Sequence, residues 1–460
     1  MIVPMSESSI HPRGAYVVAV DMGYGHQRAA FPLRGIATLP KLWDSTESTI
    51  ISANTYTNIP KKDRLIWNNI EKTYEGVSRF DSIPFLGKRI FHLMDYLHQI
   101  PPFYPRRDLS QPTLELKETY TLIRRAHWGK HLIDTLNAEP LPLICTFPVP
   151  AFFAEEHGYR GDIYCLCTDT DVARAWAPLD PTRSRITYLA PTLRAKERLK
   201  LYGIRAERII ITGFPLPEIS NRSDITAATL SRRLAVLDPH GRYRKKYGEL
   251  LDLYISDTTG ASLKQSTADV TRTPLTIMFS VGGAGAQWEI GITILESLRQ
   301  HITSGTIRLI LAAGALEYIK KKFEAAMQRL GIRSENNIVY APNTFEYFKK
   351  FAAALTETDI LWTKPSELSF YAGLGLPIII APPLGSQEES NRAWLHMVGA
   401  GIEQFDPRFT HEWLLDWLQS GWLAGAAVNG LLNTPKKAVT HIADTVIRGQ
   451  REEIEDIHFL

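Results

Sequence analysis

Residues 363–391 read TKPSELSFYAGLGLPIIIAPPLGSQEESN and indicate how the second half of the chain folds. An apolar run, 359–362, leads into a short polar turn, and a helical segment follows that ends near residues 373–375. A second apolar run, 377–381, has the length and the β-branched content of a buried strand. The order is therefore strand, helix, strand, which is the repeating unit of an open parallel sheet.

The polar side chains beside these two strands are candidates for binding a ligand. In an open parallel sheet the ligand lies outside the carboxyl ends of the strands, so we expect Ser366 and Glu367 at the mouth of a site. They begin a helix, whose free N–H groups favour anionic or hydroxyl-rich ligands. Gln387, Glu388 and Asn391 follow the second strand and reach the same edge. In the alternative interpretation these residues only cap the helices of a stable unit.

The composition argues against several classes of protein. The chain has 460 residues, of which 44% are hydrophobic and 22% charged, so it is long enough for two or three domains with cores of their own. A formal net charge of +3 is too small to indicate a nucleic-acid partner. The three cysteines, Cys145, Cys165 and Cys167, form neither a disulfide framework nor a zinc pattern. No run approaches the roughly 20 apolar residues that span a bilayer, so we expect a cytoplasmic protein without a transmembrane segment.

A glycine turn near the start of the chain is the first candidate for chemistry. The apolar run 15–20 predicts a buried strand, and it ends in a turn that contains Gly23 and Gly25. Glycines there permit a tight turn and a close backbone approach by a ligand. His26 follows at the start of a helix, where the positive helix end disfavours imidazolium, so a neutral histidine able to accept a proton is expected. A histidine that merely caps the helix is the alternative.

The first half continues as alternating strands and helices, which predicts an α/β layer domain. One of its strands, 162–168, ends at Asp169 and Asp171. Two carboxylates one residue apart are able to hold Mg²⁺ or Mn²⁺ on a nucleotide diphosphate. The pair is equally compatible with a turn in which Asp171 caps the next segment.

Residues 80–104 combine aromatic, apolar and basic side chains. Such a stripe at helical spacing is more often part of a core, which is the interpretation we favour. The alternative is a segment that rests on a membrane interface with Lys88 and Arg89 towards the lipid headgroups. The protein would then associate with a membrane at its surface.

The pattern predicts four regions along the chain. Residues 1–217 form a first Rossmann-like domain, residues 218–272 a helical or loop insertion or linker, and residues 273–440 a second Rossmann-like domain. Residues 441–460 belong to a last helix that crosses back to the first domain. The second domain begins with an apolar strand and a further glycine turn, in which Gly282, Gly283 and Gly285 would let backbone N–H groups cradle a phosphate. The two domains are expected to face each other across a cleft.

These motifs, in this order, resemble a branch of the GT-B glycosyltransferases. The branch contains monogalactosyldiacylglycerol synthases, diacylglycerol glucosyltransferases and the peptidoglycan N-acetylglucosaminyl transferase. The resemblance covers about residues 17–401 and rests on GYGHQRAA (23–30), CTD (167–169), ITGFP (211–215), SVGGAG (280–285), KP (364–365), GLPII (375–379) and QEESN (387–391).

The resemblance implies an inverting hexosyltransferase that moves a sugar from a nucleotide diphosphate sugar to a hydroxyl acceptor. Uridine is the base that the family favours, and no metal or other cofactor is required. The first domain would bind the acceptor, for which a lipid-linked or membrane-surface molecule is the candidate, and the second domain would bind the nucleotide sugar. By the same resemblance His26 is the candidate base for the acceptor hydroxyl, or a hydrogen-bond donor to it, and Asp169 is the second candidate catalytic residue.

The resemblance also assigns residues to the donor. The diphosphate would meet the backbone amides of Gly282, Gly283, Gly285 and Ala286, with Gln287 beside them. Tyr340 and Ala341 would border the base pocket, and the sugar or phosphates would meet Gln387, Glu388 and Asn391.

One position departs from the pattern of that branch. Its ribose-binding glutamate falls seven residues before Pro377, where this chain has Phe370. Either Glu367 substitutes from one turn earlier, or the ribose contact is lost. For this reason a nucleotide-sugar epimerase, or a nucleotide-sugar binding protein without catalysis, remains the alternative.

Three further classes fit the sequence less well. A metal-dependent GT-A transferase would use Asp169 and Asp171, but it does not explain a phosphate-type turn in a separate domain. A dinucleotide oxidoreductase requires Gly-x-Gly-x-x-Gly, which neither glycine turn provides. An actin-like ATPase needs a β-hairpin where residues 27–30 predict a helix.

Overall fold

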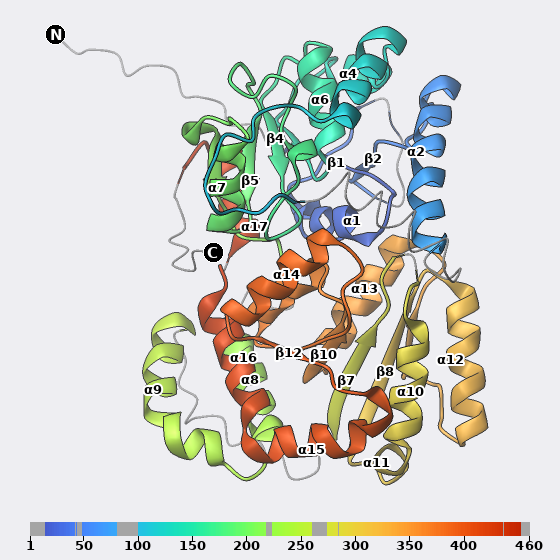
Figure 1. Cartoon of the computed structure of the whole chain (residues 1–460), viewed down its shortest axis with the longest axis vertical. Coiled ribbons are helices and arrows are strands. Elements are labelled where there is room, and N and C mark those ends of the chain that lie inside the picture. The colour runs from blue at the N-terminus through green and yellow to red at the C-terminus, as the bar shows by residue number, and fades with distance from the viewer. Residues whose placement is uncertain are drawn as a thin grey trace, which may run out of the picture.

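Two parallel six-stranded sheets, each flanked by helices, form the protein (Figure 1). The computed structural model describes residues 14–41, 43, 48–80, 100–217, 223–259, 274–283, 285–435 and 437–451. Most of the segment 80–104, for which a core or membrane-surface position is expected, therefore lies outside the described residues. The prediction of two Rossmann-like domains with a GT-B layout is confirmed.

The first sheet has the strand order β2-β1-β3-β4-β5-β6, and every neighbouring pair is parallel. Its strands are short and almost entirely buried, which agrees with the continuous apolar runs that predict them. They are β1 (Tyr16–Ala19), β2 (Ile51–Ser52), β3 (Leu143–Cys145), β4 (Ile163–Leu166), β5 (Thr187–Ala190) and β6 (Ile209–Ile211).

The second sheet has the order β12-β11-β10-β7-β8-β9 and is also entirely parallel. Numbered from β7, this is the 3-2-1-4-5-6 order of dinucleotide-binding sheets. Its strands are β7 (Leu275–Ser280), β8 (Ile307–Gly314), β9 (Ile338–Tyr340), β10 (Ile360–Thr363), β11 (Ile378–Ile380) and β12 (Gly401–Glu403).

Helices connect the strands and cover the faces of both sheets (Figure 1). Several begin at a side-chain cap: Thr192 accepts from the Ala195 N–H, and Asn343 accepts from the Glu346 N–H. The first half contains α1 (Tyr24–Ala30), η1 (Phe31–Gly35), α2 (Lys61–Phe80), α4 (Leu114–Ala126), α5 (Lys130–Leu136), α6 (Pro148–Glu156), η2 (Arg174–Trp176), α7 (Leu193–Leu201) and η3 (Ala206–Arg208).

The second half is richer in helix, and its predicted segment after β10 is a 3-10 helix, η6, instead of an α-helix. The helices are α8 (Ser223–Leu237), α9 (Arg242–Thr259), α10 (Trp288–Ser297), α11 (Arg299–Thr303), α12 (Glu317–Leu330), α13 (Thr344–Leu355), η6 (Glu367–Leu374), α14 (Ser386–Met397), η7 (Pro407–Phe409), α15 (Thr410–Ser420), α16 (Trp422–Asn433) and α17 (Ala438–Ile447).

Each sheet has one point at which the strand order reverses, and ligands of such sheets bind outside the carboxyl ends of the strands at that point. In the first sheet it lies between β1 and β3, and in the second between β7 and β10. The glycine turns follow β1 and β7 directly. The fold therefore brings both turns to the edges at which the two domains meet (Figure 1).

One hydrophobic core is shared by the two domains. Phe214, which follows β6, stacks on Phe370 of η6 with ring centroids 4.5 Å apart and an interplanar angle of 5°. The ring of Trp394 of α14 also packs against Phe370, with centroids 5.2 Å apart. Ile442 and Val446 of α17 join the same core, so the last described helix packs where the domains meet.

The region after the first sheet packs into the second domain. Leu230, Leu234 and Leu237 of α8 and Leu251 of α9 belong to the core of the second sheet. Arg233 is buried beside them and donates to the carbonyl oxygen of Thr358 at 2.9 Å. These helices are thus part of the second domain's packing.

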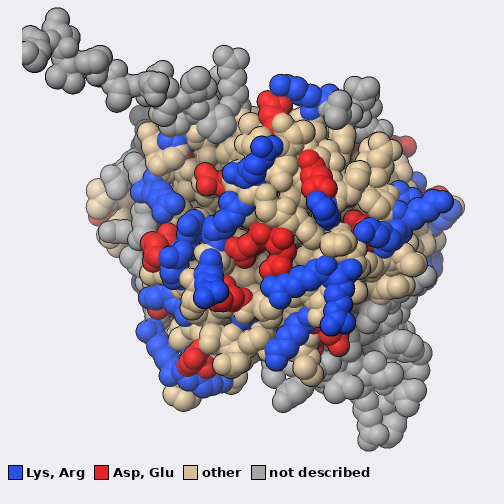
Figure 2. All heavy atoms as spheres, turned by 90° about the horizontal axis from the view of Figure 1, so that it is seen from above, with Lys and Arg blue, Asp and Glu red and all other residues tan. Residues whose placement is uncertain are grey.

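The outer face of the first domain carries both signs of charge. Figure 2, seen from above, shows Lys and Arg side chains interspersed with Asp and Glu side chains over this face. Because the signs alternate, the visible face presents no continuous basic surface that would steer a polyanion.

The stacked pair Phe214 and Phe370 generates a stability prediction. We expect Phe370→Ala to destabilise the protein by about 3–5 kcal/mol, because it opens a cavity in the shared core. Phe409→Ala is the matched control, since that ring is 49% exposed, and we expect it to change the stability by about 0.5 kcal/mol or less. Urea denaturation followed by tryptophan fluorescence measures both, and equal effects of the two substitutions would contradict the role of the stack.

Candidate functional site

The first glycine turn places His26 at the reversal point of the first sheet. Gly23 has φ of 78°, a conformation that L side chains rarely adopt, so glycine is required for the turn between β1 and α1. His26 then lies on the first turn of α1, and its Nδ1 is 2.7 Å from the carbonyl oxygen of Thr146. Thr146 follows β3, so the histidine is held across the reversal point between β1 and β3.

This contact determines the tautomer of His26. A carbonyl oxygen only accepts hydrogen bonds, so Nδ1 carries the hydrogen and Nε2 keeps a free lone pair. The ring lies edge-on to Phe147, with centroids 4.8 Å apart, and 6.1 Å from Trp176. Burial lowers the pKa of His26 to about 4, against the opposing effects of Thr146 and Glu367. His26 is therefore neutral at neutral pH, as expected, and burial is the largest cause.

Asp169, the second candidate, lies close to His26 and is tied to the other domain. The hydroxyl of Thr168 is 3.5 Å from both His26 Nδ1 and Asp169 Oδ2. Nδ2 of Asn391 donates to Asp169 Oδ1 at 3.0 Å. Burial, helped by the charges of Glu367 and Glu388, raises the pKa of Asp169 to about 6. This carboxyl group is thus poised to exchange a proton near neutral pH.

Both polar atoms of the Asn391 side chain make hydrogen bonds to the first domain, so Asn391 connects the two domains. Its Oδ1 accepts hydrogen bonds of 2.9 Å from both the backbone N–H and the hydroxyl of Thr170, while its Nδ2 holds Asp169. The side chain is completely buried. The contact of Asn391 with the sugar or the phosphates remains a prediction. In addition, its hydrogen bonds connect the second domain to Asp169 and Thr170 of the first.

Asp171 has a structural role. Its carboxylate pairs with Arg198 at 2.8 Å and with Arg194 at 3.0 Å, and the Asp171 side chain is nearly buried. Because two guanidinium groups neutralise it, Asp171 does not join Asp169 in a shared metal site. Among the described residues, no group of three or more His, Cys, Asp or Glu side chains is arranged to hold a metal ion.

The second glycine turn touches the first one. A Cβ on Gly283 would lie 2.9 Å from the backbone nitrogen of Tyr24 and 3.1 Å from the Cα of Gly23, so only glycine permits this approach. Gly285 adopts φ of 72° and Gln287 φ of 62°, and Gln287 Nε2 donates to the carbonyl oxygen of Pro382 at 2.9 Å. The predicted phosphate turn, with Ala286 between these two residues, therefore lies directly against the turn that precedes His26.

Lys364 is a site residue that the sequence analysis did not select. A Cβ on Gly282 would come within 2.6 Å of its Cε, so the lysine runs directly beside the glycine turn. Its Nζ is 2.5 Å from Oε1 of Glu388, whose Oε2 accepts from the N–H of Leu384 at 2.8 Å. The Lys-Pro pair at residues 364–365, after β10, is the feature of the sequence from which Lys364 could have been selected. Lys364 and Gly282 follow β10 and β7, the two strands at the reversal point of the second sheet.

Glu367 pairs with a buried arginine from the other domain. Nε of Arg28, on α1, donates to Oε1 of Glu367 at 2.9 Å, and the exposed fractions of the two side chains are 3% and 10%. Oε2 of Glu367 would be 3.5 Å from a Cβ on Gly25. The predicted donor residue thus faces the first glycine turn through its second carboxylate oxygen.

Aromatic rings enclose Arg28, which the sequence analysis also missed. Its guanidinium carbon lies 4.4 Å from the ring centroid of Phe351, 4.8 Å from that of Phe348 and 5.7 Å from that of Tyr347. Burial alone would lower the pKa of Arg28, but Tyr371, Tyr347 and Glu367 together raise it. The arginine is therefore charged and held by electrostatic attraction from all these groups.

Tyr24 makes another contact across the domains. Its hydroxyl accepts from the N–H of Ala315 at 2.6 Å, and its ring lies against Gly314, where φ is 72°. Gly314 pairs with Tyr340 and accepts from the N–H of Ala341, the two predicted base-pocket residues. Tyr24 therefore reaches the edge at which the base is expected.

Phe370 occupies the position at which the family pattern has its ribose-binding glutamate. It is buried in contact with Phe214 and Trp394 and presents no polar group. Ser366 is partly buried and precedes η6, and Gln387 lies on the first turn of α14, where its side chain makes no hydrogen bond to the described residues. Of the predicted donor residues at this edge, Ser366, Glu367 and Gln387 have polar side-chain atoms available for a ligand.

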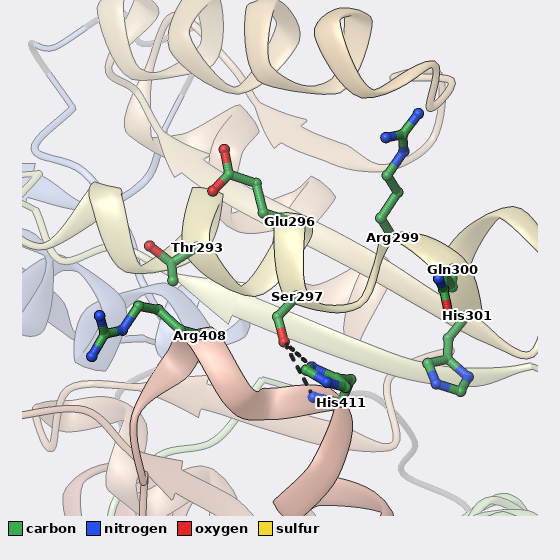
Figure 3. Close-up of a pocket in the computed structure, with 8 residues that line it drawn as sticks. All are labelled: Thr293, Glu296, Ser297, Arg299, Gln300, His301, Arg408 and His411. Carbon is green, nitrogen blue, oxygen red and sulfur yellow. Dashed lines mark hydrogen bonds between the residues drawn. The ribbon is translucent and has the colours of Figure 1, made fainter.

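A separate hollow of about 470 Å³ lies at the far end of the second domain (Figure 3). It is lined by residues of α10, α11, η7 and α15, including Ser297 and His411, whose side chains lie 3.0 Å apart. Helix α10 begins just after the glycine turn, and Ser297 is its last residue. The hollow therefore lies at the edge of the sheet opposite the glycine turn. It is not part of the candidate site.

Comparison with known proteins repeats the predicted resemblance. A family model described as a domain of unknown function, DUF6938, matches residues 256–358. A processive diacylglycerol beta-glucosyltransferase of Bacillus cereus is 22% identical over 286 residues. The match covers 60% of this chain, and the chain spans 60% of the length of that relative. The relative comes from the branch that the motifs indicate, so the chain resembles the GT-B glycosyltransferases in sequence.

Solved structures with a similar course of the chain are more distant. MnaA of S. aureus with UDP is 11% identical with a TM-score of 0.42 and coverage of 82% and 90% of the two chains. MurG of Acinetobacter baumannii is 12% identical, with a TM-score of 0.40 and coverage of 72% and 78%. The UDP-GlcNAc 2-epimerase of Neisseria meningitidis bound to UDP-GlcNAc is 12% identical, with a TM-score of 0.42 and coverage of 78% and 88%.

The low pKa of His26 has a measurable consequence. Between pH 6.5 and about 4, His26 binds a proton in the unfolded chain but stays neutral in the folded protein. The free energy of unfolding therefore decreases as the pH falls through this range. We expect the effect to be on the order of 3 kcal/mol at its largest. His26→Asn keeps a donor for Thr146 without a titrating ring and should remove this part of the pH dependence.

NMR of histidine-labelled protein tests the same property directly. The ring resonance that His26→Asn removes should not titrate above pH 5. A midpoint of 6 or higher for that resonance would contradict the assignment of a partly buried, neutral imidazole.

Proposed function

We propose that this protein is a glycosyltransferase that moves a sugar, with inversion, from a nucleoside diphosphate sugar to a hydroxyl acceptor. UDP-sugars are the favoured donors, and no metal is required. Residues 1–217 would bind the acceptor, and residues 273–440 the donor. The observation that carries the proposal is the neutral His26, held through Nδ1 by Thr146, beside two glycine turns that meet between the domains.

His26 is suited to act as the general base. In the proposed step the acceptor hydroxyl oxygen attacks the anomeric carbon while its proton moves to Nε2 of His26. The bond from that carbon to the diphosphate oxygen breaks, and the nucleoside diphosphate leaves with the electron pair. A single displacement of this kind inverts the anomeric centre. Asp169, linked to His26 through Thr168, would stabilise the imidazolium that forms.

The leaving diphosphate needs positive partners as its charge develops. The backbone amides of Gly282, Gly283, Gly285 and Ala286 would supply neutral donors, and the ammonium group of Lys364 would supply a full charge. Lys364 now pairs with Glu388, so donor binding would exchange or share this contact. The presence of a cation beside the turn supports transfer without a metal ion.

The remaining donor contacts follow from the same edge. Glu367, oriented by Arg28, would accept hydrogen bonds from hydroxyl groups of the donor through Oε2. It would thereby replace the family's ribose-binding glutamate, at whose position this chain has Phe370. Gln387 would bind the sugar, and Tyr340 and Ala341 would border the base. Gly23, Gly25 and Ser366 would line the space between the domains.

The acceptor rests on weaker grounds. The Bacillus cereus relative is named for transfer to diacylglycerol, and this supports a lipid acceptor as the first molecule to try. Among the described residues no helix is long and apolar enough to cross a bilayer. We propose separately that a lipid acceptor is reached from the membrane surface.

Replacement of His26 tests the proposal. With UDP-glucose, UDP-galactose and UDP-N-acetylglucosamine as donors and diacylglycerol vesicles as acceptor, we expect His26→Asn to lower turnover by about 10²–10⁴-fold. The affinity for UDP should stay within about threefold, because the substitution removes the base and not a donor contact. His240→Asn is the control, since His240 is exposed on the loop after α8.

Three outcomes would contradict the proposal. Undiminished turnover of His26→Asn would remove His26 from the mechanism. Epimerised donor formed without any acceptor would identify an epimerase. UDP binding without release of UDP from any donor would identify a binding protein.

A further inference from the structure

The second glycine turn has a neighbour on the side away from Lys364. Lys364, after β10, lies beside Gly282 at the start of the turn. On the other side lies α12, the helix that follows β8 and packs against α10 (Figure 1). No donor contact proposed so far comes from this helix.

Tyr318, on the first turn of α12, reaches the end of the glycine turn. A Cβ on Gly285 would lie 2.7 Å from the hydroxyl oxygen of Tyr318, 2.6 Å from Cδ1 of Ile319 and 2.8 Å from Cδ1 of Leu316. Because residue 285 is a glycine, the phenol hydroxyl approaches the backbone of the turn directly.

Packing between two helices fixes the position of this tyrosine. Ile319, the next residue, is fully buried in the core of the second domain. The ammonium group of Lys322, one turn further along α12, lies 4.1 Å from the ring centroid of Trp288, the first residue of α10. The start of α12 is therefore held against the start of α10.

The hydroxyl of Tyr318 is available to a ligand. The side chain is 51% exposed, and within the described residues no hydrogen bond engages its hydroxyl. The N–H of Gly285, in contrast, donates to the carbonyl oxygen of Gly282 at 2.8 Å and closes the turn. A phenol hydroxyl is able to donate one hydrogen bond. A ligand at this end of the turn would therefore meet the Tyr318 hydroxyl before it meets the amide of Gly285.

We propose that Tyr318 is a further donor-binding residue, whose hydroxyl donates a hydrogen bond to a diphosphate oxygen of the nucleotide sugar. This inference rests on the proposed function, which places the diphosphate on the turn between Gly282 and Gly285. A hydrogen bond to a charged oxygen is stronger than one between neutral groups, and a donor already in place needs no rearrangement when the ligand binds. Lys364 and Tyr318 would hold the diphosphate from the two ends of the turn.

Tyr318→Phe tests this inference, because it removes the hydroxyl and keeps the ring. We expect it to weaken the binding of UDP, measured by calorimetric titration, by about 10-fold or more, the usual effect of one hydrogen bond to a charged group. Uridine has no phosphate, so its binding, measured by ligand-observed NMR, should be unchanged. The thermal unfolding midpoint should also stay the same, since the packing of the ring remains.

The matched control is Tyr247→Phe, which removes the hydroxyl of another partly exposed tyrosine of the same domain, on α9, and should leave UDP binding unchanged. Equal UDP affinity of Tyr318→Phe and the unmodified protein would overturn the role of Tyr318 and leave the proposed function intact. An equal loss of affinity for uridine and UDP would also overturn it, because the tyrosine would then contact the base or the ribose. If the unmodified protein binds none of UDP, GDP and ADP, the proposed function itself fails, and this inference fails with it.

Discussion

The buried ion pair between Arg28 and Glu367 is the contact on which the arrangement of the two domains depends. Two charges removed from water are stable only with good geometry and further partners. Here the 2.9 Å hydrogen bond and the surrounding aromatic rings supply those partners. Because Arg28 lies two residues after His26, the pair fixes the turn that carries the candidate base against the donor domain.

Several weaker contacts act in the same direction. The hydroxyl of Tyr24 accepts from Ala315, Asn391 joins Asp169 to Thr170, and Phe214 stacks on Phe370. Each pair contains one residue from each half of the chain. The two halves of the proposed active site are thus held in register by a charge pair, hydrogen bonds and a ring stack, while the neutral His26 and the cation Lys364 occupy opposite sides of the boundary.

Much of the fold follows from local patterns in the sequence. Continuous apolar runs such as Leu275–Ser280 are buried parallel strands, and the glycine turns after β1 and β7 lie where such turns bind phosphates. A neutral His26 was also predicted, from its position at the start of a helix. In the structure, burial is the largest cause of its lowered pKa. The segment after β10 was predicted as helix, and it forms a 3-10 helix whose residues are almost all buried.

The contacts between the halves were not predictable in this way. Arg28 and Glu367 are 339 residues apart, and no periodicity or spacing relates them. Asn391 was predicted to contact the sugar or the phosphates, and nothing in the sequence indicates its hydrogen bonds to Asp169 and Thr170 of the other half or its complete burial. The sequence marks Phe370 as a departure from a family pattern, and only its stacking partner Phe214 explains why an aromatic ring suits that position.

Calorimetric titration with UDP, with EDTA present and again with Mg²⁺, tests the central claim that the second glycine turn and Lys364 hold a nucleoside diphosphate without a metal. The account predicts the same affinity under both conditions. It also predicts that Lys364→Met weakens binding by about 10–100-fold, as expected for loss of a charged hydrogen bond, while Lys321→Met leaves it unchanged. Binding that requires Mg²⁺, binding of NAD or ATP in place of UDP, or an unaffected Lys364→Met variant would contradict it.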